Sequence, residues 1–563
     1  MHEYLGHLAD EYRSGRVGRR TFIRWAATLG LSAPAISAIL AACTPAPAAP
    51  SANTGPNSAA PTSAPTSASA ASTSAAPAAA AAATAQPVRG GTIRVTGSPA
   101  VEINPHKLTS NGGIITTFPC LNFLARVSGD GVPQPELATS WTPSADTKTW
   151  TFKLRQGVKF HDGSSFSADD VVATYKRLAD KSTGSTAAST LNFLPPDGIE
   201  KVDDYTVAFH LSRAQADFPY YTYIYQAGIL PANWSGDWAT SPIGTGPFKM
   251  NSYTAGQGST YARNESYWEN GLPYLDGIDI KIWQDPSGEL TALQSGASDM
   301  MALTPYDALD DIRKNPNLQV LSSRSASYDA MHMRVDTPPF DNPKVRQALA
   351  MAINRQDVLN IVLGPDGGDL ASDQPVAPIL RDHVDVAMKS QDIAMAKQLL
   401  AEAGHPNGFD FDLPTHSGAE WLKNWALTLQ QAFAPLGVKA NLVVETSQVY
   451  YTHWTTVTTG VTEWASRSTA SEILNAAYRT GVNWNSAHWS NPAFDTALDQ
   501  LDATVDLNKR KELMLTLEKA LSDEVPAIIT YARSSPRGLS KRVQGMSQDP
   551  NRYLDLRSVY LTT

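Results

Sequence analysis

The sequence predicts an α/β protein with two or three lobes, preceded by a segment that takes no part in the fold. Patterns typical of helices and of short strands are mixed along the chain from about residue 87 onward. With 563 residues the chain is too long for one hydrophobic core, so we expect the core to divide. Residues 1–86 carry neither pattern and are considered first.

The N-terminal segment has the layout of an export signal. Arg19 and Arg20 form a basic pair, and residues 25–42 after them carry no charge. A basic start, an apolar middle and a small-residue end are typical of such signals. The stretch GRRTFIR resembles the twin-arginine export motif, which is read by a receptor. An uncleaved transmembrane helix is the alternative, but the apolar stretch is near the lower length limit for a span and contains Gly30 and Pro34.

The apolar stretch ends in Leu40-Ala41-Ala42-Cys43, which resembles a bacterial lipobox. Cleavage before Cys43 would leave this cysteine as the lipid-bearing N-terminus. Residues 44–86 contain only Ala, Pro, Ser, Thr, Gly, Asn and Gln, which cannot bury enough apolar surface to become ordered. We therefore expect an exported protein, tethered through lipid on Cys43 to the outer face of the cytoplasmic membrane, periplasmic or at the cell surface.

Composition and motifs limit the function. The net charge of −9 argues against a nucleic-acid partner, because phosphate binding requires clustered Lys and Arg. Gly244-Thr245-Gly246 is followed by Pro247 and indicates a turn rather than a phosphate-binding loop. His161-Asp162-Gly163 also indicates a turn rather than a metal site, and Cys120, the second of two cysteines, lies in an apolar stretch that predicts burial. No motif of a hydrolase, a zinc protease or a nucleotide enzyme is present, so we expect no enzyme, no cofactor and no metal.

Local patterns predict individual elements of the folded part. Trp150, Phe152 and Leu154 alternate on one face of a strand, and a second alternating strand covers 205–211. Ser167 and Asp170 form a capping box that begins a helix. Three more helices are predicted from apolar periodicity and capping residues, beginning at Asn342-Pro343 and covering 392–403 and 507–522.

Five segments in order resemble the family 5 solute-binding proteins, which include receptors for peptides, nickel, opines and some sugars. These segments are PELATSWTPSADTKTWTFKLRQGVKFHDGSSFSADDVVATYKR at 135–177, SPIGTGPFK with the later RNESYW, PPFDNPKVRQALAMAINRQDVL at 338–359, AKQLLAEAGHPNGFDF at 396–411 and SNPAFDTALDQLDATVDLNKRKELMLTLEKALSDEVPAI at 490–528. The resemblance covers nearly all of 87–563.

The resemblance implies an α/β, two-lobed type II periplasmic-binding-protein (Venus-flytrap) fold with an extra inserted domain. Lobe I is expected from 87–130, 240–325 and 536–563, the inserted domain from 131–239, and lobe II from 326–535. The lobes would enclose a solute in the cleft between them and close by hinge motion.

The implied function is a monomeric receptor that captures a small polar solute, peptide-like, opine-like or related, and delivers it to the transmembrane subunits of an ABC permease. A ligand-sensing adaptor that docks on a membrane signalling protein is the alternative, because it would have the same fold. A neighbouring gene for a permease or for a sensor kinase would distinguish the two functions.

The resemblance also indicates where the solute binds. Peptide-binding members typically place an Asp shortly after a Trp in the second lobe, where it pairs with the amino group of the ligand. The matching stretch here runs from Trp464 to Arg467, with Arg467 near the position of the Asp, and the stretch 474–485 after it resembles a subgroup tied to opine-like solutes. The residues expected to bind the solute are Trp464, Ala465, Ser466, Arg467, Gly97, Ser98, Tyr328, Trp484 and Asn485.

Arg467 is the residue with the sharpest chemical implication. A guanidinium offers a planar fork of donors that matches a carboxylate or phosphate. We therefore expect a solute with an anionic group, as in an opine or an amino-acid conjugate. The alternative is that Arg467 pairs with a nearby Asp or Glu and braces lobe II.

Overall fold

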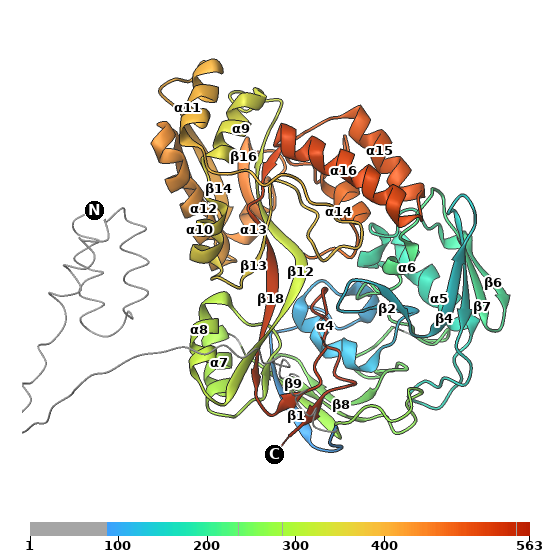
Figure 1. The fold of residues 1–563 in the computed structure, drawn as a ribbon. Helices are drawn as coiled ribbons and strands as arrows, with labels where there is room; N and C mark the ends of the chain where they lie inside the picture. The colour runs from blue at the N-terminus through green and yellow to red at the C-terminus, as the bar shows by residue number, and fades with distance from the viewer. Residues whose placement is uncertain (1–86, 235, 284, 548, 563) are drawn as a thin grey trace, which may run out of the picture. The chain divides into compact units, whose positions relative to one another are not determined.

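A computed structural model describes residues 87–562 apart from 235, 284 and 548 (Figure 1). Residues 87–563 form a compact unit of their own. The predicted export signal with Arg19 and Arg20, the lipidation site Cys43 and the tether lie outside the described residues. Within the described part of the chain, no helix combines the length and the apolar character that a membrane span requires.

A ten-stranded mixed sheet carries the fold. Its main path runs β16-β12-β18-β11-β1-β10-β9-β8, with β13 beside β18 and β17 beside β12. Strand β1 is parallel to β10 and β11, and the remaining pairs are antiparallel. The strands are β1 (Thr92–Gly97), β8 (Phe248–Thr254), β9 (Gly258–Arg263), β10 (Gly277–Ile282), β11 (Met300–Met301), β12 (Leu318–Met333), β13 (Gly368–Leu370), β16 (Thr459–Trp464), β17 (Ala527–Ile528) and β18 (Tyr531–Ser540).

The two longest strands, β12 and β18, pass through the middle of the unit (Figure 1). They pair with each other, while β18 also pairs with β11 on one side and β12 with β16 on the other. Their register shifts between Ser323 and Ser327. Such an irregularity bends a strand and increases its twist. It falls where the sequence predicts the border between lobe I and lobe II, whose exact boundaries stay a prediction.

The region predicted as the inserted domain contains a four-stranded antiparallel sheet in the order β4-β5-β7-β6. Its strands are β4 (Ala138–Pro143), β5 (Thr149–Leu154), β6 (Ile199–Asp203) and β7 (Thr206–His210). Trp150, Phe152 and Leu154 are all buried, which confirms the predicted alternation. Helix α5 (Ala168–Ala179) begins with the predicted capping box of Ser167 and Asp170.

The predicted helices are confirmed with small shifts of their ends. The helix after Asn342 is α9 (Pro343–Met351), and the amide of Lys344 donates to the Asn342 side chain. The helix expected over 392–403 is α11 (Ile393–Glu402), and that over 507–522 is α16 (Leu507–Glu524). The other helices are α4 (Asn111–Thr117), α6 (Phe218–Tyr221), α7 (Pro286–Gln294), α8 (Leu309–Lys314), α10 (Arg355–Val362), α12 (Glu420–Phe433), α13 (Ser447–Tyr450), α14 (Ala470–Ala477) and α15 (Pro492–Ala503).

Three two-stranded sheets complete the described strands. One of them is parallel and joins β14 to β15, and the other two are antiparallel. Their strands are β2 (Ala125–Val127), β3 (Pro133–Pro135), β14 (Asp410–His416), β15 (Lys439–Glu445), β19 (Val543–Gln544) and β20 (Tyr560–Leu561).

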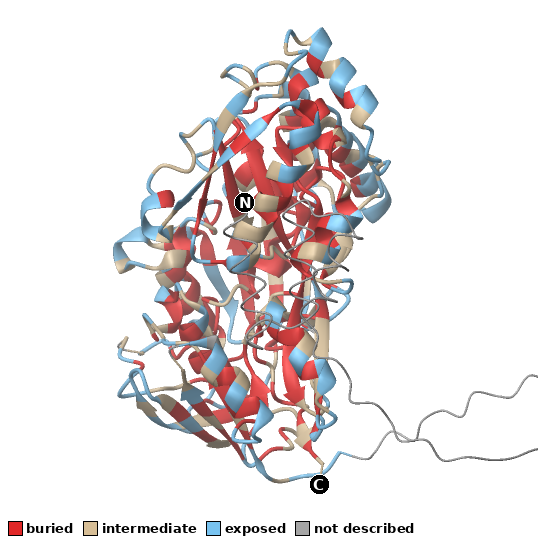
Figure 2. Ribbon diagram, turned by 90° about the vertical axis from the view of Figure 1, so that its left-hand side faces the viewer, coloured by how far each residue is buried: buried red, intermediate tan, exposed pale blue. Residues whose placement is uncertain are grey.

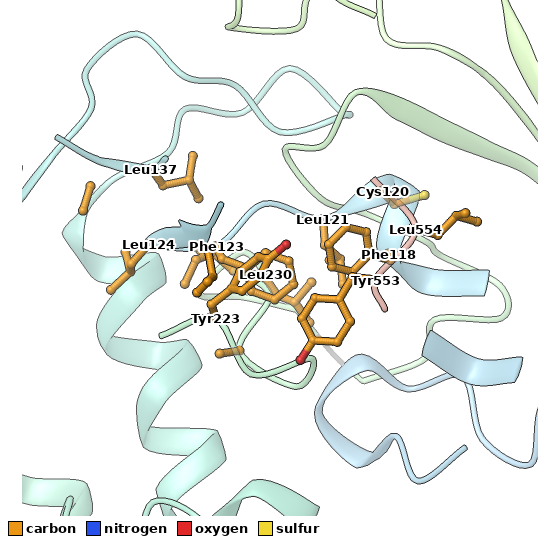
Figure 3. Packing of buried hydrophobic residues seen from close by; sticks show 14 of the residues in the cluster. Phe118, Cys120, Leu121, Phe123, Leu124, Leu137, Tyr223, Leu230, Tyr553 and Leu554 are labelled. Atoms are coloured by element: carbon orange, nitrogen blue, oxygen red, sulfur yellow. The ribbon is translucent and has the colours of Figure 1, made fainter. Parts of the chain in front are cut away.

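Buried residues run through the interior of the folded unit (Figure 2), and the apolar ones among them form separate clusters. Two clusters lie entirely within 326–535, whereas the cluster around Phe118 lies entirely outside that range. In this last cluster Tyr553, close to the C-terminus, packs against Phe118 and Tyr223 (Figure 3). The ring centroid of Tyr553 lies 5.1 Å from the ring centroid of each partner. The C-terminal segment is thereby fixed to a core that the predicted lobe I shares with the predicted inserted domain.

Glycine is required where the Gly244-Thr245-Gly246 turn meets Cys120. A Cβ atom on Gly244 would lie 2.0 Å from the carbonyl oxygen of Cys120, and one on Gly246 would lie 2.3 Å from its carbonyl carbon. Cys120 itself has no exposed surface, as predicted. These glycines therefore allow two backbone segments to approach closely, which agrees with the interpretation of the motif as a turn.

A buried ion network joins α16 to the region predicted as the inserted domain. Arg510 has no exposed side-chain surface, and its Nη2 lies 2.7 Å from Asp217 and 2.6 Å from Asp382. The Nη1 of Arg510 donates to the carbonyl oxygens of Leu501 and Thr504, so the guanidinium is satisfied on all sides. Because Asp217 lies at the start of α6 and Asp382 within 326–535, one guanidinium holds two parts of the chain together.

We predict that Arg510→Ala destabilises the protein by about 3–5 kcal/mol, because it leaves the buried carboxylate of Asp382 without its counter-ion and that of Asp217 with only Arg381, at 3.2 Å. Urea and thermal unfolding would measure the loss. Lys511→Ala is the matched control, since Lys511 is exposed on the same turn of α16. Equal unfolding midpoints for the two variants would contradict the structural role of Arg510.

Candidate functional site

The residues predicted to bind the solute lie at the ends of two strands and in the loops that follow them. Gly97 ends β1 and Trp464 ends β16, which pairs with β12. In open α/β sheets, ligands bind in crevices outside the carboxyl ends of strands, at points where the chain changes direction across the sheet. Gly97 and Trp464 both lie at the carboxyl ends of strands, but on opposite sides of the β12–β18 pair.

Three of the predicted residues come together in an aromatic cluster made of Tyr328, Trp454, Trp464 and Trp484. Trp464 lies opposite Tyr328 in the β12–β16 register, and their rings stack with centroids 6.0 Å apart and planes 11° apart. Trp454 and Trp484 meet the Trp464 ring edge-on, at 5.8 and 6.1 Å. Trp464 is 7% exposed and Trp484 is 48% exposed, so the cluster runs from the core of the 326–535 region to its surface.

The inner side of this cluster is closed. A cavity of about 10 Å³ lies beside Trp464, lined also by His332, Tyr478 and Ala527. This volume is enough for about one water molecule. A solute that uses these aromatic rings must therefore approach from the side of Trp484.

Ala465, Ser466 and Arg467 follow β16 and differ in exposure. Ala465 is exposed, and the Ser466 hydroxyl accepts a hydrogen bond from the amide of Ala326 at 3.2 Å. The Nε of Arg467 lies 3.4 Å from the Glu472 carboxylate, and its Nη1 donates weakly to the Ser466 carbonyl at the same distance. Burial raises the pKa of Glu472, and the charge of Arg467 opposes that rise. The guanidinium thus has one carboxylate partner within lobe II, while its Nη2 forms no hydrogen bond with a described residue.

The other predicted residues are occupied by local contacts. The carbonyl of Gly97 accepts a hydrogen bond from the amide of Trp283 at 3.0 Å, and Ser98 is half-buried. Asn485 is 5% exposed, and its amide group donates to the carbonyls of Arg479 and Trp489 and accepts from the amide of Trp489. No described hydrogen bond, ion pair or ring contact joins Gly97, Ser98 or Asn485 to the aromatic cluster. Asn485 therefore fixes the loop that carries Trp484.

A second set of polar residues, which the sequence did not single out, lies next to Trp464. Arg533 on β18 donates to the carbonyl of Trp464 at 3.2 Å and pairs through Nε with Asp329 of β12 at 3.0 Å. Burial opposes the charge of Arg533, but Asp329 together with Tyr306, Tyr531 and Glu463 outweighs this effect and raises its pKa. The hydroxyl of Tyr531 donates to the other oxygen of Asp329 at 2.9 Å. The central strands therefore hold a buried charge pair at the end of β16.

Aromatic rings from both sides of the central strands cover this pair. The guanidinium of Arg533 lies 5.0 Å from the ring centroid of Trp421, at the start of α12. Trp421 meets Tyr306 at 5.8 Å, and the Tyr306 hydroxyl donates to the carbonyl of Ser534 at 2.6 Å. Tyr306 lies in the short 3-10 helix Tyr306–Ala308, within the range predicted for lobe I. Residues of both predicted lobes thus meet at Arg533.

Another ion pair, between His416 and Glu463, lies at the end of β14. Nε2 of His416 is 2.6 Å from Glu463 of β16, and Tyr451 approaches the same imidazole nitrogen at 3.4 Å. Burial by itself raises the pKa of Glu463, but the hydrogen bond and charge of His416 outweigh it and the net pKa is lowered. Glu463 therefore carries its charge at neutral pH and balances part of the positive charge around Arg533.

The sequence held few signals for this second set. Asp329, Glu463 and Arg533 are far apart along the chain and form no motif. The one available signal is the stretch Tyr531–Ser540, a strand of mostly small residues that contains both Arg533 and Arg537. Arginines in a buried strand need partners or a function, because burial of a charge is costly.

The architecture defines the class of the protein. HbpA2 from Haemophilus parasuis aligns with a TM-score of 0.74 and 24% identity, over 84% of this chain and 100% of that chain. AgaA from A. tumefaciens R10, solved in complex with agropinic acid, aligns with a TM-score of 0.70 and 26% identity, over 84% of this chain and 99% of that one. The fold is that of the two-lobed periplasmic binding proteins, which confirms the predicted fold class.

The sequence comparisons show the family. A model of the bacterial extracellular solute-binding proteins, family 5, matches residues 132–486. Heme-binding protein A of Haemophilus influenzae is 28% identical over 463 residues, covering 75% of this chain and 82% of the relative. Glutathione-binding protein GsiB of Pectobacterium atrosepticum is 28% identical over 456 residues, covering 76% and 85%. The chain belongs to the family 5 extracellular solute-binding proteins, whose members bind small solutes outside the cytoplasm and work with ABC permeases.

Proposed function

We propose that the protein is a lipid-anchored, monomeric receptor that captures a small peptide-like or opine-like solute between its lobes and delivers it to an ABC permease. The observation that carries the proposal is the meeting of charged and aromatic residues from both predicted lobes around Arg533, on strands that the lobes share. This is a place for binding and orienting a polar ligand. The relatives are solute-binding proteins, which supports a receptor without catalytic activity.

The solute class follows from the same residues and from the relatives. Glutathione and agropinic acid, named for two of the relatives, both carry carboxylates. Arginine donors and flat aromatic walls suit such compounds, because a guanidinium matches a carboxylate and rings cover apolar parts of the ligand. The Nη2 of Arg467 has no described partner, so it can donate to a carboxylate of the solute while Nε stays paired with Glu472. A sensing adaptor has no support from the comparisons.

We expect binding to close the lobes about β12 and β18. A panel of peptides, glutathione and opine-type acids should contain a compound that raises the melting temperature, because binding stabilises the folded state by mass action. The same compound should reduce the radius of gyration measured by small-angle scattering. A rise in melting temperature without compaction would argue against closure, and a panel without any binder would argue against the solute class.

We predict that Arg467→Ala weakens binding of the identified solute about tenfold or more, the loss expected for a charged hydrogen bond. Arg467→Lys should restore only part of the affinity, since lysine lacks the planar fork. Isothermal calorimetry measures both, and the melting temperature of the ligand-free protein should change little. Unchanged affinity in Arg467→Ala would assign the residue to bracing lobe II through Glu472.

Lipid anchoring at Cys43 is proposed from the lipobox and the tether after it. Cys43→Ser should move the protein from the membrane fraction to the soluble fraction, because the thiol that accepts the lipid is lost. Replacing Arg19 and Arg20 by Lys serves as the matched comparison, since it should block twin-arginine export and leave the cysteine intact. If Cys43→Ser stays with membranes through a carbonate wash, an uncleaved helix is the anchor.

A further inference from the structure

The C-terminal segment brings another arginine to the region around Arg533. Arg552 has a φ of +67°, in the left-handed region that residues with a Cβ rarely adopt. Its surroundings hold it there: its amide donates to the carbonyl of Asp549 at 3.0 Å, and its carbonyl accepts from Nη2 of Arg537 at 2.6 Å. Such a conformation persists only where the neighbouring structure fixes it, and it is common at ligand sites.

Contacts on both sides of Arg552 fix the segment further. Tyr553 is buried against Phe118 and Tyr223 in the lobe I core (Figure 3), and its carbonyl accepts a second bond from Arg537 at 3.1 Å. On the other side, the side-chain amide of Asn551 donates from Nδ2 to the Ser468 hydroxyl at 3.1 Å. Arg552 and Arg467 therefore flank a hydrogen bond that joins the C-terminal segment to the loop after β16. This is a junction between the two predicted lobes.

The charge of Arg552 has no counter-ion among the described residues. Arg467 pairs with Glu472 and Arg533 pairs with Asp329, but Arg552 forms no ion pair and no side-chain hydrogen bond with a described residue. The residue is half-buried. Burial lowers the pKa of its guanidinium, Tyr306 opposes this effect, and the neighbouring charge of Arg533 lowers the pKa further. A half-buried cation beside a second cation is a costly arrangement unless an anion joins it.

Arg537 adds to the positive character of this junction. It is 8% exposed and forms no ion pair with a described residue. Its Nη2 donates to the backbone carbonyls of Arg552 and Tyr553. It therefore acts on the ligand site by positioning the backbone of Arg552.

We propose that the guanidinium of Arg552, with Arg533 beside it, binds a carboxylate of the solute at the junction between the lobes. The inference rests on the proposed function and names a contact in addition to Arg467. A carboxylate there would supply the counter-ion that Arg552 lacks among the described residues, and it would add a bridge to the link that Arg537 already forms between the C-terminal segment and β18. A solute with a free carboxylate is selected over its amide, because the amide leaves the arginine unpaired.

The test uses acid and amide forms of matched probes on the full-length protein. The probes are glutathione, trialanine and agropinic acid, with trialanine amide as the partner of trialanine that lacks the carboxylate. Calorimetry would compare the parent with Arg552→Asn and Arg552→Lys. Asparagine tolerates a left-handed backbone, so Arg552→Asn should keep the melting temperature of the ligand-free protein. Arg126→Gln, which removes one positive charge from the half-exposed Arg126–Glu269 pair, is the control for net charge.

The expected result is that acids which bind the parent bind Arg552→Asn about tenfold or more weakly, Arg552→Lys at an intermediate level and Arg126→Gln as the parent does. Trialanine amide should not distinguish the parent from Arg552→Asn. Equal affinity of an acid for the parent and Arg552→Asn overturns this inference and leaves the proposed function standing. If no acid binds the parent, both the proposed solute class and this inference are overturned.

Discussion

The antiparallel pair β12–β18 is the constraint on which the rest of the structure depends. Both strands extend to either side of the register shift at Ser323 and Ser327, so each strand runs through both predicted lobes. Every strand of the large sheet is attached on one side or the other of this pair. A backbone ladder resists stretching but bends where its register is irregular. The same two strands therefore run through both predicted lobes and bring Trp464, Arg533 and Tyr306 close together.

Buried ion pairs also join distant parts of the chain. Arg533 on β18 and Asp329 on β12 neutralise each other inside the sheet, while Arg510 neutralises Asp217 and Asp382 at the contact with α6. Both pairs are buried, and both join segments that are remote in the sequence. Their cost of desolvation is offset only when the partners are held in good geometry. Near the C-terminal segment, by contrast, Arg552 forms no ion pair with a described residue.

Local patterns were enough to predict the secondary structure but not the site. The alternation of Trp150, Phe152 and Leu154 and the capping residues Ser167 and Asn342 act within a few residues, so they can be seen in the sequence. The fold class came from the resemblance of five long segments to one family. Of the predicted solute-binding residues, Tyr328, Trp464 and Trp484 lie together, whereas Asn485 is used to fix a loop and Arg467 has a partner in Glu472. Arg533 and Arg552 could not be found, because their importance comes from neighbours that are distant in sequence and from a backbone conformation that only the folded chain imposes.

The position of β18 has a consequence for how the protein reaches its native state. This strand begins at Tyr531, close to the end of the 563-residue chain, yet it lies between β12 and β11 in the sheet. Until β18 has been made, β12 and β11 have no neighbour on the side that β18 fills. Unpaired strand edges invite association with other chains, and pairing of such distant segments is slow because a long loop must close first. The large sheet can therefore be completed only once β18 has paired with β12 and β11, and until then the central strand edges of the new chain are unpaired.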